Sequence, residues 1–220
     1  MIKVDLHLHS PTSKKIGDAI GWISLATTIN KIRNQDIQLI SFTDHDHFSA
    51  KFYQELTEQL IGTNIRAFPG CELTIARKTR GTGHILFIFD NKYTPQELKQ
   101  LERIINEIRL HSSTGGAKIA KVIAKLRDYD FMICPHVDKV DAVTWADVAE
   151  VKDYIFNVEC SRKSVKYAKF LREANGTNIN PVKFSDCHLW NDDKFKWTGC
   201  YLQEYHQFAD IKNKLKMMEG

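Results

Sequence analysis

Apolar and polar side chains alternate at the start of the chain. In residues 2–10, apolar residues at positions 4, 6 and 8 alternate with Asp5, His7 and His9. Because successive side chains of a strand point to opposite faces, this pattern predicts a strand from which His7 and His9 project to the same side. Two imidazoles spaced in this way can hold one metal ion, but two histidines that simply face water fit the pattern equally well.

Runs of apolar residues predict further buried strands, and helical spacing of apolar residues predicts the segments between them. Thr94, Pro95 and Glu97 mark one helix start, as the cap, a proline in the first turn and the partner in a capping box. The basic stretch 76–83 is expected to be a loop. The expected strands are residues 2–10, 37–43, 65–68, 84–89, 131–134, 154–159, 179–184 and 197–203, and the expected helices are residues 18–34, 49–61, 94–110, a segment from about Gly116 to Tyr129, 144–152, 164–174 and 210–218.

The order of these elements predicts the fold class. Strands that alternate with helices are typical of an α/β protein with a mainly parallel sheet. A series of about seven such units in one domain favours a barrel closed by βα repeats. We therefore expect residues 1–220 to form a single domain.

Composition narrows the choice of protein class only slightly. The chain has 220 residues, 43% of them hydrophobic and 26% charged, which is ordinary for a globular protein. Its net charge of +4 permits an anionic substrate without requiring nucleic acid. The apolar run 85–89 is too short to span a bilayer, and residue 1 leads directly into a predicted strand without a signal-peptide pattern. Five widely spaced cysteines argue against a disulfide framework, so we expect a cytoplasmic protein.

Candidate metal ligands recur where the predicted strands end. In a βα barrel the carboxyl ends of the strands meet at one face, where active sites are built. One candidate, His84, instead opens a strand, but it follows a long loop and could face the same side. The alternative is a set of unrelated polar strand ends. The candidates are His7, His9, Asp44, His45, Glu72, His84, His136, Asp186 and His188.

Mixed histidine and carboxylate ligands indicate zinc, manganese or iron rather than calcium. So many ligands require more than one ion, and either Glu72 or Asp186 could bridge two. Paired metal ions are the usual device for phosphoester hydrolysis, because they activate a water and stabilise the leaving oxygen. The pattern thus favours a phosphoesterase with two or three divalent ions.

Five short motifs in this order resemble those of the PHP (polymerase and histidinol phosphatase) superfamily, over residues 1 to about 205. The resemblance implies a distorted (β/α)7 barrel, a trinuclear metal centre and phosphoesterase activity. The motifs are Asp5-Leu6-His7-Leu8-His9-Ser10, Thr43-Asp44-His45-Asp46, Pro69-Gly70-Cys71-Glu72, Pro135-His136 and Ser185-Asp186-Cys187-His188.

Carried over residue by residue, the resemblance implies three metal positions. The first would be held by His7, His9, Glu72 and Asp186; Glu72 would bridge to a second, also held by His84 and His136; and His45 and His188 would hold the third. We expect the catalytic residues to be His7, His9, Glu72, His136 and Asp186.

The third metal position departs from the family pattern. Members of the family usually supply one more ligand shortly after the first motif, and here that position holds Lys14. Asp18 is the candidate replacement, although it could equally cap the following helix. The departure favours an alternative in which the chain is a non-catalytic or structural PHP domain within a larger assembly.

Substrate recognition would require cations near the metal centre. Arg162 follows the strand that ends at Glu159, and Lys139 lies just beyond His136, so both are predicted to bind substrate phosphate. The substrate would be a phosphorylated small molecule, or a nucleotide or nucleic acid. The segments 185–188 and 196–202 also resemble PHP domains joined to a chromosome-segregation-type ATPase. No P-loop is present in this sequence, so the ATPase would be a separate partner or a domain outside it.

Overall fold

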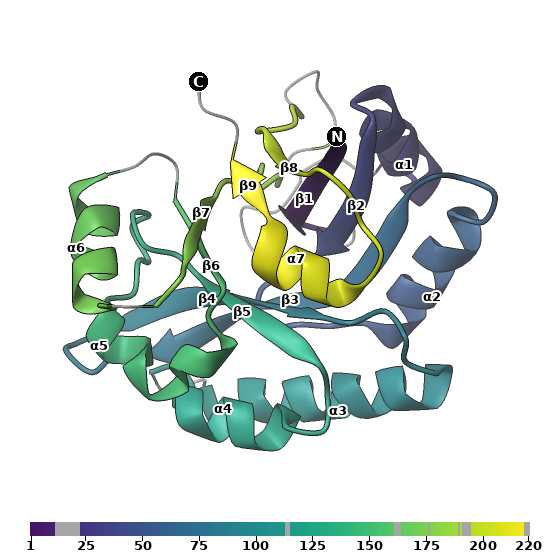
Figure 1. Cartoon of the computed structure of the whole chain (residues 1–220). Helices are drawn as coiled ribbons and strands as arrows, with labels where there is room; N and C mark the ends of the chain where they lie inside the picture. The colour runs from purple at the N-terminus through teal and green to yellow at the C-terminus, as the bar shows by residue number, and fades with distance from the viewer. Residues whose placement is uncertain are drawn as a thin grey trace.

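The computed structural model describes residues 1–11, 23–112, 115–160, 164–175, 177–188, 190 and 195–217. Figure 1 shows their arrangement. The elements, in chain order, are β1 (Ile2–Leu8), α1 (Leu25–Asn34), β2 (Ile37–Phe42), α2 (Ala50–Gln59), β3 (Arg66–Ala76), β4 (Thr82–Phe89), α3 (Pro95–Ser112), α4 (Ile119–Leu126), β5 (Phe131–Pro135), α5 (Trp145–Val148), a 3-10 helix η1 (Ala149–Tyr154), β6 (Asn157–Glu159), α6 (Val165–Glu173), β7 (Asn180–Val182), β8 (Cys200–Leu202), α7 (Phe208–Lys214) and β9 (Lys216–Met217).

The main sheet is mixed rather than mainly parallel. Its strand order is β5-β4-β3-β2-β1-β8-β9, in which β1 pairs with β2 and β2 with β3 in parallel. The pairs β3–β4, β4–β5, β1–β8 and β8–β9 are antiparallel. The prediction of a mainly parallel sheet was therefore wrong, because β3 and β4 form a hairpin with no helix between them.

A second, two-stranded sheet curls the structure further. Strands β6 and β7 pair in parallel. Isolated bridges join Ile133 of β5 to Ile155 and His136 to Glu159, and another joins Leu8 of β1 to Cys187. The result is an α/β fold with a curled, half-barrel sheet (Figure 1), and the distorted (β/α)7 barrel remains a prediction.

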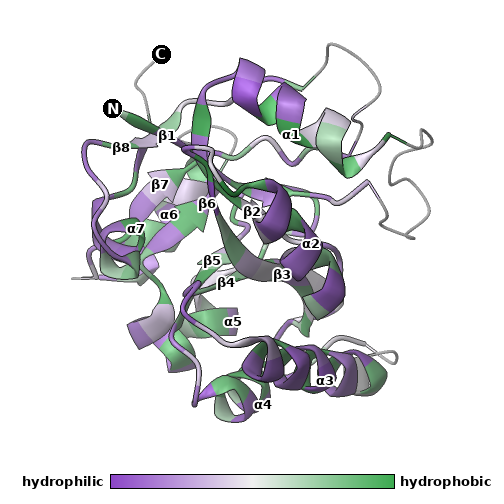
Figure 2. Ribbon diagram, turned by 90° about the vertical axis from the view of Figure 1, so that its right-hand side faces the viewer, coloured by the Kyte–Doolittle hydropathy of each residue, from purple (hydrophilic) through white to green (hydrophobic). Residues whose placement is uncertain are grey.

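The convex side of the curled sheet is covered by helices. Figure 1 shows α3 and α4 below β3–β5, α1 and α2 beside β2, and α5 and α6 at the opposite side. In Figure 2, α1, α2 and α3 carry both hydrophilic and hydrophobic residues, as expected of helices with one face on a sheet. The larger apolar core lies in this layer and includes Ile32, Leu56, Leu101 and Ile133.

The concave side holds a second apolar core. Leu86 and Ile88 of β4 belong to it, together with Met132 of β5. Helix α7 lies against this side in Figure 1 and contributes Phe208 and Ile211. Because side chains alternate along a strand, His84 shares the face of Leu86 and Ile88. The concave side is therefore apolar at one end and polar at the other.

Strand β1 does not alternate regularly. Its pairing with β2 shifts register between Asp5 and Leu8. Val4 belongs to the inner apolar core, whereas Leu8 belongs to the outer one, so the expected strict alternation along residues 2–10 was wrong. A register shift of this kind re-aims side chains, and both His7 and His9 face Glu72 on the concave side, as predicted from their spacing.

Caps explain where helix boundaries differ from the predictions. Helix α1 begins at Leu25 because the Ser24 hydroxyl accepts a hydrogen bond from the Thr27 backbone; residues 18–22 of that predicted helix lie outside the described residues. Helix α7 begins before the predicted start at Asp210, because Gln207 is the cap and Asp210 closes the capping box. Within the described residues, every helix is too short or too polar to cross a bilayer.

Candidate metal centre

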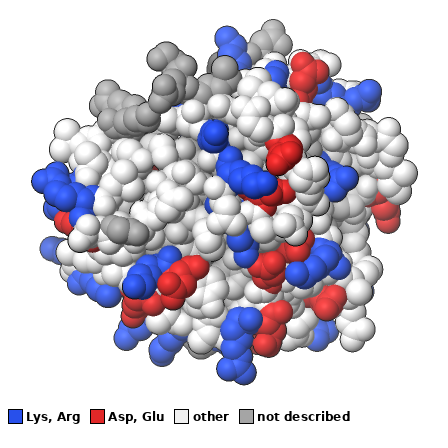
Figure 3. Space-filling model, viewed as in Figure 1, with Lys and Arg blue, Asp and Glu red and all other residues white. Residues whose placement is uncertain are grey.

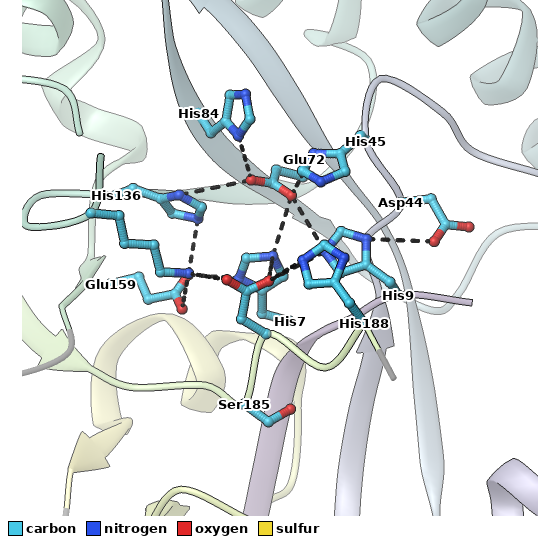
Figure 4. A network of polar contacts seen from close by, with 12 residues as sticks. His7, His9, Asp44, His45, Glu72, His84, His136, Glu159, Ser185 and His188 are labelled. Carbon is cyan, nitrogen blue, oxygen red and sulfur yellow. Dashed lines mark hydrogen bonds and ion pairs between the residues drawn. The ribbon is translucent and has the colours of Figure 1, made fainter. Parts of the chain in front are cut away.

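The predicted metal ligands within the described residues lie together at the polar end of the concave side. Glu72 occupies the middle of the group, with imidazoles around it (Figure 4). The sequence predicts Glu72 at a strand end, but Glu72 lies within β3, because this strand continues to Ala76. The assembled residues are His7, His9, His45, Glu72, His84, His136, Asp186 and His188. Asp18 and Arg162 lie outside the described residues, as does Lys14.

The two oxygens of Glu72 face different ligands. Glu72 Oε2 lies 3.3 Å from His7 Nε2, 3.5 Å from His9 Nε2 and 2.9 Å from His45 Nδ1. Glu72 Oε1 lies 2.7 Å from His84 Nδ1 and 3.7 Å from His136 Nδ1. The carboxylate therefore has one oxygen on each side, as a bridge between two metal ions requires.

Asp186 stands beside the ligands of β1. Its Oδ1 lies 3.2 Å from His7 Nε2, 3.4 Å from His9 Nε2 and 3.0 Å from His188 Nε2. The Asp186 backbone is left-handed, with a φ of 50°, which is uncommon outside glycine and typical of positions constrained by their surroundings. His188 also stacks on His9, with ring centroids 3.9 Å apart.

Backbone hydrogen bonds hold the ligand-bearing segments together. The Glu72 amide donates to the Asp44 carbonyl, and the Asp46 amide donates to the Glu72 carbonyl. The Asp44 carboxylate accepts from both the amide and the hydroxyl of Ser10. These bonds join the ends of β1 and β2 to the middle of β3, so His9, His45 and Glu72 are positioned as one unit.

Glu159, at the end of β6, is a central residue that the sequence did not single out. Its Oε2 accepts a hydrogen bond from His7 Nδ1 at 2.8 Å and lies 3.0 Å from His136 Nε2. Its Oε1 lies 2.9 Å from Lys139 Nζ. Each imidazole thus turns one nitrogen toward Glu159 and the other toward Glu72, which is how an outer carboxylate orients histidine ligands.

Lys139, which is predicted to bind substrate phosphate, lies within the group. In this structure its ammonium contacts two carboxylates. Its Nζ lies 2.9 Å from both Glu159 Oε1 and Asp186 Oδ2. Burial lowers the pKa of Lys139, but Glu159 and Asp186 outweigh burial and raise it above its usual value, so the amine stays charged. Lys139 therefore supplies a fixed positive charge at the edge of the cluster.

The charges of the cluster are strongly coupled. Burial lowers the pKa of His7, but Glu159 and Glu72 more than offset this effect and raise it to about 10. Burial raises the pKa of Glu72, and the neighbouring imidazoles outweigh it and hold that pKa well below its usual value. Glu72 thus remains ionised and holds positive charge close to it. At neutral pH this charge is carried by protonated His7.

The donor set fits divalent metal ions. His9 is almost fully buried, yet neither of its ring nitrogens has an aligned hydrogen-bond partner among the described residues. Nδ1 of His45 and Nε2 of His136 are also buried and also lack an aligned hydrogen-bond partner among the described residues. Buried polar atoms without partners are costly, and nitrogens that face carboxylate oxygens at ligand spacing gain partners when a cation lies between them. In four groups of residues, one donor atom from each member lies within 4.8 Å of the others. The groups are His7–His9–Glu72, Glu72–His84–His136–Asp141, His9–His45–His188 and His7–His136–Glu159.

Comparison with known proteins places the fold. Neither the protein-family models nor the curated proteins contain a match. Among solved structures, PsfC from Pseudomonas syringae superposes with a TM-score of 0.60 at 16% identity, covering 99% of this chain and 91% of PsfC. A candidate metal-dependent phosphoesterase from Bifidobacterium adolescentis superposes with a TM-score of 0.59 at 12% identity, covering 87% of this chain and 90% of that one.

A third neighbour is a two-domain protein from Bacteroides vulgatus, which contains a predicted PHP-like metal-dependent phosphoesterase. It superposes with a TM-score of 0.57 at 13% identity, covering 86% of this chain. The chain spans about half of that protein, 52% of its length. At these identities the likeness establishes a shared fold with these three proteins.

Proposed function

We propose that this protein is a metal-dependent phosphoesterase. The observation that carries the proposal is the convergence of histidines and carboxylates from strands β1 to β7 and their following loops around Glu72, with buried imidazole nitrogens that lack aligned hydrogen-bond partners among the described residues. Structural neighbours named as metal-dependent phosphoesterases support the same class of enzyme. The expected ions are zinc, manganese or iron, two or three per chain.

The chain's own donors define where these ions would be held. His7, His9, Glu72 and Asp186 would hold the first, and Glu72 would also reach the second, with His84 and His136. The third would lie by His45 and His188, which form a close donor group with His9, and Asp18 stays a candidate. Bound metal ions would lower the pKa of a water and neutralise charge on the phosphoryl group.

Lys139 and Glu159 would position the substrate. The Lys139 ammonium is held by Glu159 on one side and shared with Asp186 on the other. A phosphoryl oxygen that approaches Asp186 would therefore meet a fixed cation, which stabilises the negative charge that develops there. Arg162 remains a second candidate for phosphate binding.

The substrate class is a phosphomonoester, or a nucleotide or nucleic-acid phosphodiester. On the face shown in Figure 3, basic and acidic side chains are interspersed, which suits a small anionic substrate at least as well as a long nucleic acid. Cooperation with a separate ATPase and a cytoplasmic location stay predictions from the sequence.

Hydrolysis of generic phosphoesters tests the proposal. The chain, loaded in turn with Mn²⁺, Zn²⁺ or Fe²⁺, is expected to cleave p-nitrophenyl phosphate or its bis ester, and chelation should abolish turnover. The variant His7→Ala should lose at least about 100-fold in kcat/KM, because it removes a ligand and a partner of Glu159. His206→Ala, whose side chain is 71% exposed, is the matched control and should keep full activity. Bound metal without turnover of either ester would favour a non-catalytic PHP domain instead.

A further inference from the structure

Asp141 lies in the loop that follows β5 and is tied to two of the candidate ligands. The His84 amide donates a hydrogen bond to the Asp141 carbonyl, and the Val143 amide donates to the His136 carbonyl. Gly83 allows this close approach, since a Cβ there would clash with the Val143 side chain. The loop is therefore fixed to the strands β4 and β5 that carry His84 and His136.

The Asp141 carboxylate completes a compact group of donors. Its Oδ2 lies 2.6 Å from His84 Nδ1 and 3.3 Å from His136 Nδ1, the same two nitrogens that face Glu72 Oε1 at 2.7 Å and 3.7 Å. These separations bracket the edge of a tetrahedron with metal–ligand bonds of about 2.0–2.2 Å, which is roughly 3.4 Å. All four atoms lie within 4.8 Å of one another.

Hydrogen bonding alone does not account for this arrangement. His84 Nδ1 faces two carboxylate oxygens at hydrogen-bond distance, but one ring nitrogen carries at most one proton. Two carboxylates and two neutral imidazoles would balance a single dication.

We propose that Asp141 is a fourth protein ligand of the metal ion held by Glu72, His84 and His136. The inference rests on the proposed metal-dependent function and refines it. Four protein donors close a tetrahedral site, whereas the third position, with His9 assigned to the first ion, has His45 and His188 and stays open. Water and substrate would accordingly bind on the side of His45 and His188, while the ion beside Asp141 would serve to hold Glu72 in place.

Zinc binding by two carboxamide variants tests the inference. Asp141→Asn keeps a hydrogen-bond acceptor for His84 but removes the charge, and is expected to raise the zinc dissociation constant at least 10-fold, with one ion fewer retained per chain after chelator dialysis. Asp138→Asn changes a carboxylate of the same loop that lies outside the donor group, and should retain zinc like the unaltered protein. Circular dichroism of the metal-free variants should match the unaltered protein.

A crystal structure of the zinc-loaded protein distinguishes a ligand from an outer partner. The inference predicts anomalous density for an ion with Asp141 Oδ2 at about 2.0–2.2 Å. An ion bound without Asp141, or equal zinc retention by Asp141→Asn and Asp138→Asn, would overturn the inference and leave the proposed function standing. If the unaltered protein retains no zinc, manganese or iron, the proposed function fails as well.

Discussion

Glu159 shows how one outer carboxylate can organise two candidate metal ligands. It is 1% exposed, and it contacts His7 Nδ1 and His136 Nε2 from the side opposite Glu72. A carboxylate in this position selects the ring nitrogen that is left to bind metal, and so orients both imidazoles before any ion arrives. The two histidines belong to different metal positions in the proposed centre, so Glu159 couples them.

The variant Glu159→Gln should weaken metal binding about 10- to 100-fold. Both imidazoles face Oε2 and Lys139 faces Oε1, so the amide removes the charge that holds the imidazoles and, with its oxygen toward them, turns an NH2 group toward the Lys139 ammonium. Calorimetric titration with Zn²⁺ measures the effect. Glu58→Gln, on the exposed surface of α2, is the control and should bind as the unaltered protein does. Equal zinc affinity in the two variants would contradict the orienting role assigned to Glu159.

The candidate ligands that lie in recognisable motifs can be predicted from the sequence, whereas two carboxylates of the same cluster, Glu159 and Asp141, cannot. His7, His45, His136 and Asp186 lie in the short sequence motifs that resemble those of the PHP superfamily. Glu159 ends a predicted strand, 152 positions after its partner His7, and nothing local distinguishes it from a solvent-facing acid. Asp141 sits in an irregular loop, where no periodicity predicts the direction of a side chain.

At the scale of elements, the hairpin β3–β4 is the main feature that the sequence does not predict. It also explains why Glu72 and His84 lie together. The sequence predicts a strand that ends at Phe68 and a loop over residues 76–83. The pairing instead continues from Gly70 to Ala76, with Thr74 opposite His84 and Glu72 opposite Leu86. Glu72 and His84 are therefore diagonal neighbours on one face of the hairpin.

Asn157 joins β6 to the helix that closes the apolar end of the concave side. Its Nδ2 donates to the carbonyls of Ile211 and Lys212 at 3.3 Å and 3.2 Å. The variant Asn157→Ala should lower the free energy of unfolding by about 1–3 kcal/mol, because buried carbonyls lose a donor. Asn213→Ala removes a similar but exposed bond to Ala209 and should change stability by less than about 0.5 kcal/mol. Urea denaturation compares the two variants, and equal losses would contradict the role assigned to α7.

At the scale of the whole molecule, the concave side of the sheet has an apolar end and a polar end. Apolar side chains from β4, β5 and α7 fill one end, and the histidines and carboxylates occupy the other. The sequence predicts the α/β class and most strand positions, because apolar runs reveal buried strands. It does not predict the mixed sheet or the register shift in β1, since both depend on pairing between distant segments.

The protonation of the cluster sets the pH dependence of metal binding. His7 and His84 have pKa values raised to about 10 and about 9, because nearby carboxylates outweigh the opposing effect of burial. Both rings are therefore protonated at pH 6, and a metal ion must displace those protons to bind. Metal affinity should accordingly rise as the pH increases from 6 toward 9.

The most direct test of the metal centre is the number of ions that the purified chain retains. Elemental analysis after loading with Zn²⁺ or Mn²⁺ and desalting, at pH 6 and at pH 8.5, gives that number. The account predicts at least two ions per chain at pH 8.5, fewer at pH 6, and a loss of bound metal in Glu72→Gln, the variant that removes the shared carboxylate. Retention of no metal at either pH would contradict the account.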